Sequence, residues 1–221
     1  MISDEFELQY WRAYITLEKE FFESEPYVDF SQDNFSTFSS NYGKLLLQIG
    51  SEVDISCKYF CRLLGDNSAR SIGRYGIDIR KAYPDFTNVG VRVLNRNFSI
   101  FPWKNWTNKN APDWWAIYNN YKHGRLEICK IKGHENVPNY KLANLQNVMN
   151  GLAGLYQIEL YCFYHISITE PSIPYKLPLP GSRLFNLFGK GTPWDDTTFA
   201  RDIAFLDTED GPIYVIGNFQ Y

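Results

Sequence analysis

Apolar residues recur every three or four positions over several stretches of the chain, and this spacing predicts helices. The longest are residues 4–25, a stretch from about Ser39 to Leu64, and one from about Tyr140 to Ile168. Shorter helices are expected at residues 70–84 and from about Pro112 onward. Each helix has an apolar stripe that must be buried against a neighbour. The chain is therefore predicted to be mainly α, with a bundle of four to five helices.

Two short segments have the alternating pattern of β-strands. Residues 88–103 alternate around Asn95-Arg96-Asn97, which predicts a small β-hairpin inserted among the helices. Two strand-like runs around Asp210-Gly211 predict a second hairpin near the end of the sequence. Four prolines between residues 170 and 181 cannot continue the last helix. We expect a helical domain at residues 1–168, a Pro-rich linker at 169–182 and a C-terminal extension at 183–221.

Small residues interrupt the last long helix. Gly151 and Gly154 each cost about 1 kcal/mol relative to alanine inside a helix. With Ala143, Asn147 and Ala153 they predict a surface that another helix approaches closely. That neighbour belongs either to the same chain or to a second subunit.

Charge is unevenly distributed along the chain, although the net charge is only −3. Residues 1–57 hold three Lys and Arg against eleven Asp and Glu, and residues 58–109 hold ten against three. Residues 110–221 hold nine against eleven. Such segregation is typical of a surface that binds polyanions, or of acidic and basic faces that pair within a dimer. The third interpretation is an ordinary set of solvated helix faces.

No uncharged apolar run is long enough to cross a membrane. The nearest candidate, residues 151–168, contains Gln157, Glu159 and His165 and is interpreted as a buried helix. The first residues are acidic and lack the basic-then-apolar order of a signal peptide. We expect a cytoplasmic protein that does not contact a membrane.

The four cysteines do not form a disulfide framework or a zinc site. Cys57 and Cys61 are four residues apart and would share a helix face, but no further Cys or His pair completes a ligand set. They are predicted to be small core residues. No metal and no cofactor are expected.

The stretch DWWAIYNNYKHGRLEICK, residues 113–130, combines aromatic, amide and basic side chains. At about 100° per residue, one side of a helix over residues 114–127 holds Trp115, Asn119, Lys122, His123 and Leu126. Tyr118, Lys122 and Arg125 form a neighbouring stripe. A histidine beside an amide and two cations can move protons and contact phosphate. The alternative is a histidine with a structural or surface role.

This stretch resembles the signature helix of the HEPN superfamily of helical-bundle proteins. The family signature is an arginine, a polar residue and, several positions later, a histidine, and Asn119 and His123 match its last two parts. Tyr118 stands where the family has arginine, and NNYKH is similar to variants with an Asn-x-x-Lys-His core. The resemblance covers about residues 40–168 and includes the preceding helix, LLLQIGSEVDISCKYFCRLL.

The resemblance implies a metal-independent endoribonuclease of a toxin–antitoxin or phage-defence system, with a composite site in a homodimer. His123 would be the acid–base group, and Asn119 would orient the imidazole or the phosphate. Lys122 and Arg125 would supply the charge that Tyr118 lacks. The implied partners are RNA or a nucleotide and an antitoxin or defence protein. The alternative is a non-catalytic HEPN-like module that binds nucleotide, RNA or protein.

Two further groups are candidates for the site. Glu52, on the second long helix, would pair with Lys122, Arg125 or His123 if the two helices face each other, and is otherwise a surface carboxylate. The tryptophans at positions 103, 106, 114 and 115 would either stack on bases or fill the core.

Overall fold

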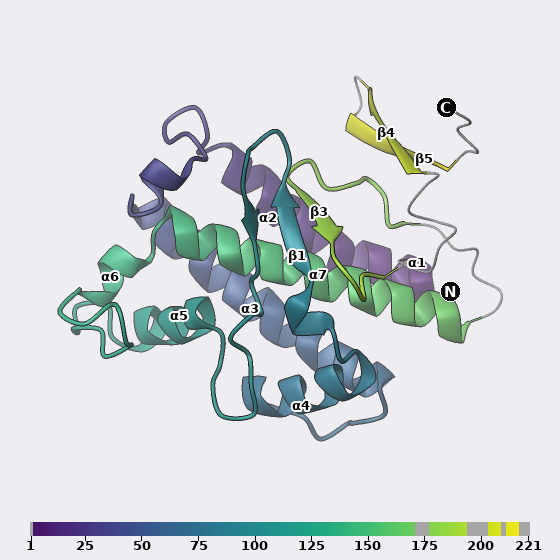
Figure 1. Cartoon of the computed structure of the whole chain (residues 1–221), viewed down its shortest axis with the longest axis horizontal. Helices are drawn as coiled ribbons and strands as arrows, with labels where there is room; N and C mark the ends of the chain where they lie inside the picture. Colours follow the sequence, from purple (N-terminus) through teal and green to yellow (C-terminus); the bar gives the residue numbers. More distant parts are fainter. Residues whose placement is uncertain (1, 171–176, 194–202, 209–210, 217–221) are drawn as a thin grey trace.

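The computed structural model describes residues 2–170, 177–193, 203–208 and 211–216, and side chains within residues 4–170 and 177–193 (Figure 1). Within these residues the chain is mainly helical, with one three-stranded and one two-stranded antiparallel sheet. The prediction of a mainly α fold is confirmed. Part of the predicted Pro-rich linker, residues 171–176, lies outside the described residues.

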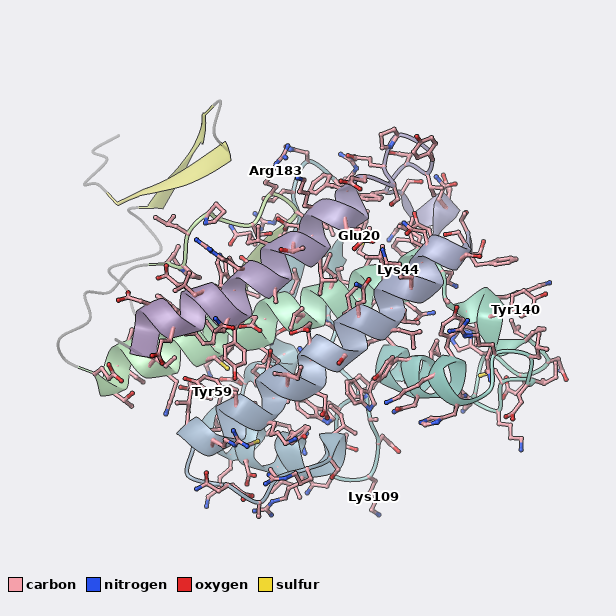
Figure 2. The ribbon with its side chains drawn as sticks, turned by 180° about the vertical axis from the view of Figure 1, so that it is seen from behind. Glu20, Lys44, Tyr59, Lys109, Tyr140 and Arg183 are labelled. Atoms are coloured by element: carbon pink, nitrogen blue, oxygen red, sulfur yellow. The ribbon has the colours of Figure 1, made fainter. Side chains whose placement is uncertain are left out.

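The first predicted helix is one continuous helical run with an irregular turn. It consists of α1 (Ile2–Phe6), a π-helical turn η1 (Glu7–Trp11) and α2 (Arg12–Phe22). Apolar spacing does not reveal a π turn, because a single wider turn alters the pattern very little. The turn ends at Trp11, which is fully buried and donates its indole N–H to the carbonyl oxygen of Pro180 at 2.8 Å. An ion pair between Glu20 and Lys44 joins α2 to the next helix (Figure 2).

Two long helices, α3 (Ser40–Leu63) and α7 (Leu145–Thr169), lie side by side at the centre of the molecule (Figure 1). Ser39 caps α3 by accepting a hydrogen bond from the backbone N–H of Tyr42 at 3.0 Å. The bounds predicted for α3 are confirmed. The predicted start of α7 near Tyr140 is wrong, because Tyr140 lies in the short helix α6 (Asn139–Leu142). Asn144 then caps α7, accepting from the N–H of Asn147 at 3.1 Å.

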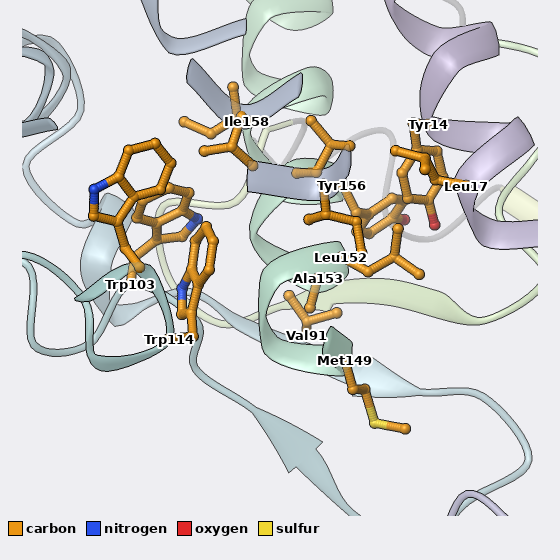
Figure 3. Close-up of a cluster of buried hydrophobic side chains, with 14 of the residues drawn as sticks. Tyr14, Leu17, Val91, Trp103, Trp114, Met149, Leu152, Ala153, Tyr156 and Ile158 are labelled. Atoms are coloured by element: carbon orange, nitrogen blue, oxygen red, sulfur yellow. The ribbon is translucent and has the colours of Figure 1, made fainter. Parts of the chain in front are cut away.

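The small-residue surface of α7 receives tryptophan rings of the same chain (Figure 3). A Cβ added at Gly154 would lie 3.1 Å from Trp114 and 3.2 Å from Trp103. At Gly151 it would lie 3.1 Å from Ile49 and 3.3 Å from Trp114. The predicted close approach is therefore confirmed, and the neighbours are aromatic and aliphatic side chains within the chain.

The predicted hairpin insertion follows α4 (Ile72–Ala82) and a 3-10 turn, η3 (Phe86–Asn88). Its strands β1 (Gly90–Val93) and β2 (Ser99–Ile100) are antiparallel, with Val91 opposite Ile100. Asn95 in the turn has a positive φ of 57°, a conformation that asparagine tolerates well. The hairpin is confirmed.

A third strand, β3 (Phe185–Phe188), pairs antiparallel with β1 and makes the order β2-β1-β3. The start of the predicted C-terminal extension thus belongs to the sheet of the helical domain. The buried carboxylate of Glu18 anchors this segment to α2, because it accepts from the backbone N–H groups of Arg183 and Leu184, both at 3.1 Å. Tyr14 also donates its hydroxyl to Glu18 at 2.6 Å.

The second predicted hairpin is also present. Strands β4 (Ile203–Thr208) and β5 (Gly211–Ile216) pair antiparallel, with Thr208 opposite Gly211. Among the described helices, none combines the length and apolar character that crossing a bilayer requires.

Candidate functional site

The helix predicted over residues 114–127 is α5 (Asp113–His123), and it is shorter than expected. Gly124, with φ −158° and ψ 77°, ends it. Asn139 completes the C-terminal end by donating from Nδ2 to the carbonyl oxygen of Gly124 at 2.7 Å. Arg125 and Leu126 therefore follow the helix, and their predicted places on its faces are wrong. The periodic pattern ran past a glycine that the backbone uses as a stop.

Two tyrosines of α5 are buried against glycines of α3. A Cβ at Gly50 would overlap the Tyr118 ring, and a Cβ at Gly43 would overlap that of Tyr121. Close approach of α5 to α3 thus depends on positions without side chains. Tyr118 is only 4% exposed, so it packs beneath the candidate site and has almost no surface with which to contact a substrate.

Two exposed cations lie over these tyrosine rings. Lys122 Nζ is 5.7 Å from the ring centroid of Tyr118, and Arg125 Cζ is 4.9 Å from that of Tyr121. Such cation–π contacts restrain the side chains and leave their N–H groups for a ligand. The structure therefore brings Arg125 close to the end of α5, although it is outside the helix.

Asn119 and His123 are separated by one helical turn on the same helix as Lys122. Asn119 is half-buried, while Lys122 and His123 are exposed. Within the part of the chain that the structure describes, none of these three side chains makes a hydrogen bond or ion pair with another residue. An exposed imidazole beside an amide and an ammonium group can exchange protons with a bound molecule and contact its negative charge.

Glu52 does not join this group. It lies about 200° around α3 from Gly50, which faces α5. It lines a groove against the first helical run together with Leu8, Arg12 and Gln48. Partial burial there raises the pKa of its carboxyl group. The predicted pairing of Glu52 with Lys122, Arg125 or His123 is wrong, because α3 turns its other side toward α5.

The four tryptophans considered for base stacking lie in the core. Trp103, Trp106, Trp114 and Trp115 are all buried. Three of them, Trp103, Trp106 and Trp114, donate their indole N–H groups to backbone carbonyl oxygens, as when Trp114 donates to Pro102 at 2.9 Å. The core interpretation is confirmed and base stacking is wrong. The cysteines at positions 57, 61, 129 and 162 are buried free thiols, so the core prediction for Cys57 and Cys61 is confirmed too.

The sequence pattern missed a polar cavity at the other end of α5. Asp113 and His134 both line it, although 21 positions separate them in the chain. His134 reaches it because the loop after α5 folds back, with Ile128 and Pro138 forming a β-bridge. No local motif could reveal this site, since its side chains come from four separate segments.

The chain was compared with family models, curated proteins and solved structures. No family model, no curated protein and no solved structure matches it.

Proposed function

We propose that the exposed end of α5 contacts RNA and that the protein is an HEPN-like, metal-independent endoribonuclease. The observation that supports this most is the placement of Asn119, Lys122 and His123. They share the solvent-facing end of one helix, with no bond to another described residue, while the neighbouring tyrosines anchor that helix to α3. A rigid helix that presents unused acid–base and cationic groups is suited to a ligand with a phosphate.

In the proposed reaction His123 accepts the proton of an RNA 2′-hydroxyl group. The 2′-oxygen attacks the adjacent phosphorus, and the bond from phosphorus to the 5′-oxygen breaks. The products are a 2′,3′-cyclic phosphate and a 5′-hydroxyl end, because the 5′-oxygen takes up the proton that His123 accepted. Asn119 holds the imidazole or a phosphate oxygen. The reaction requires no redox step and no metal ion.

Lys122 and Arg125 are the proposed stabilisers of negative charge in the transition state. Such electrostatic stabilisation is usually the largest contribution to catalysis of this kind. Arg125 has a planar guanidinium group that can hold two phosphate oxygens, whereas Lys122 supplies a single point of charge. In a homodimer, the family's arrangement, the same cations of a second copy would reach the site. An antitoxin or defence protein remains the proposed partner in the cytoplasm.

A second candidate function is a non-catalytic HEPN-like binding module. It is favoured by Tyr118, which occupies the position of the family's arginine and is buried against Gly50. A cation at that position would have to be buried, so the site depends entirely on Lys122 and Arg125. In this case the same surface binds RNA, a nucleotide or a protein and leaves it intact.

The test uses the full chain with structured RNA in excess EDTA. His123→Ala should reduce cleavage by about 10²- to 10⁴-fold, the usual contribution of a general acid–base group. Lys122→Ala should also reduce it, whereas Lys130→Ala, a matched change at an exposed lysine in the following loop, should not. RNA binding without cleavage would select the non-catalytic module. Equal cleavage by the unaltered chain and His123→Ala would refute the proposed chemistry.

A further inference from the structure

The cavity at the start of α5 has a volume of about 210 Å³. It is bordered by the loop after β2, the first residues of α5, the loop between α5 and α6, and the first two turns of α7. Its polar lining includes Lys104, Asn105, Asp113, His134, Gln146 and Asn150. At about 30 Å³ of liquid per water molecule, the volume equals about seven waters. This is below the range of pockets for drug-sized ligands and suits a single planar ring system.

The lining contains a group that only accepts hydrogen bonds, the carboxylate of Asp113, and two that only donate them, the ammonium group of Lys104 and the indole N–H of Trp114. The indole N–H is bonded to a backbone carbonyl oxygen, so of these two donors Lys104 remains for a ligand, while the amide side chains both donate and accept. Asn105 Nδ2 donates to Asp113 Oδ2 at 3.0 Å, which orients the carboxylate and leaves Oδ1 and the second lone pair of Oδ2 for a ligand. The ring of Phe101, 42% exposed, adds an apolar surface.

We propose that this cavity binds a guanine base, either in a free nucleotide or at an unpaired position of an RNA strand. The Watson–Crick edge of guanine has two adjacent donor groups beside a carbonyl oxygen, whereas each other RNA base has one donor group at that edge. The carboxylate of Asp113 accepts from both guanine donors, and Lys104 donates to the carbonyl oxygen. Phe101 supplies the stacking surface. Proteins read unpaired bases through such edge contacts and aromatic stacking.

The RNA form of this inference rests on the proposed function. α5 has 11 residues and is therefore about 16 Å long, a distance that a few nucleotides span. A guanine held beside Asp113 then places a nearby phosphate of the same strand at His123. Cleavage is expected a few nucleotides from a guanine.

The test is calorimetric titration of the full chain with GMP, AMP, CMP and UMP. GMP should bind at least tenfold more tightly than the others, and Asp113→Asn should weaken GMP binding by roughly 10- to 100-fold, as expected for contacts to a charged group. Asp33→Asn is the matched control, because it removes an exposed carboxylate outside the cavity and should change nothing. Gln146→Ala is a second lining variant that leaves Asp113 in place and should also weaken GMP binding.

Equal affinity for the four nucleotides, no GMP binding at millimolar concentration, or unchanged GMP binding by both lining variants would overturn the inference. Two RNA oligonucleotides that differ only by guanine or adenine at one unpaired position distinguish a site for an RNA base from a site for a free nucleotide. A guanine preference that Asp113→Asn abolishes identifies an RNA base, and GMP binding without that preference identifies a free nucleotide. The nuclease proposal is tested independently of this inference. Cleavage that survives in His123→Ala would refute the nuclease but would not affect the result for GMP binding.

Discussion

Glu159 of α7 is a carboxyl group enclosed in the core, only 1% exposed. Its Oε1 accepts a hydrogen bond from the hydroxyl of Ser56 at 2.5 Å, and its Oε2 has no partner among the described residues. Burial raises the pKa of this carboxyl group from its ordinary value near 4.5 to about 8, the Ser56 bond opposes the shift, and the charge of Glu52 adds to it. Glu159 is therefore mostly protonated in the folded protein at neutral pH.

The pKa of Glu159 is higher in the folded chain than in the unfolded chain, so the unfolded chain releases this proton first as the pH rises. Its contribution to stability is complete below about pH 4.5 and is lost as the pH rises to about 8. Between pH 6 and pH 8 the loss is about 2 kcal/mol, from about 1.4 kcal/mol per pH unit with flattening near the folded pKa.

Glu159→Gln tests this value, because glutamine has nearly the same shape and does not titrate. The protonated carboxyl group already places one O–H donor at Oε2, and the glutamine amide places two N–H donors there, so the variant should be about 1–3 kcal/mol less stable than the unaltered chain at pH 6. By pH 8 that difference should shrink by about 2 kcal/mol. Urea unfolding followed by tryptophan fluorescence at both pH values measures the free energies of unfolding.

Burial lowers the pKa of the His165 imidazole, but this residue is present in both proteins and cancels in the comparison. Cys57 and Cys162 stay protonated in the folded state, because burial raises the pKa of each thiol. Glu23→Gln, at an exposed position, is the control and should parallel the unaltered chain. If the free energies of unfolding of the unaltered chain and of Glu159→Gln change in parallel from pH 6 to pH 8, the reasoning about the buried carboxyl group is refuted.

Three further predictions concern packing and charge. Gly50→Ala forces the Tyr118 ring aside and should cost about 1–3 kcal/mol in urea unfolding, whereas Gly73→Ala, which meets open space in α4, should stabilise by up to about 1 kcal/mol. Glu18→Ala removes the acceptor that anchors residues 183–184, so limited proteolysis should cut between α7 and β3 sooner, with about 2–4 kcal/mol lost in unfolding free energy. Lys122→Ala should lower the salt dependence of RNA binding by about one unit of slope, and an unchanged slope would exclude a phosphate contact at that position.

The local structure of this chain could largely be predicted from the order of its residues. The helices α3 and α4, the β1–β2 hairpin and the glycine surface of α7 all follow from apolar spacing, caps and turn residues that act over a few positions. The errors lie at places where a distant group intervenes. α5 ends at His123 because Gly124 breaks the pattern and Asn139 bonds to the exposed carbonyl.

The candidate site likewise has a part that could be predicted from the sequence and a part that could not. Asn119, Lys122 and His123 could be grouped from the sequence because a single helix holds them at fixed intervals. Tyr118 could not be placed inside or outside by spacing alone, since its burial depends on Gly50 in another helix. The predicted pairing of Glu52 with α5 was wrong for a related reason. The sequence indicates which residues share a face of a helix, but not which neighbouring helix that face contacts.

Sequence alone thus determined the long helices, both hairpins, the helical class and the group of side chains on α5, because these depend on interactions between residues close in the chain. Only the tertiary structure decided that β3 joins the β1–β2 sheet, that the buried Glu159 has no second partner among the described residues, and that Asp113 and His134 border one cavity. Each of these depends on residues far apart in the chain, whose proximity is set by the packing of the whole core.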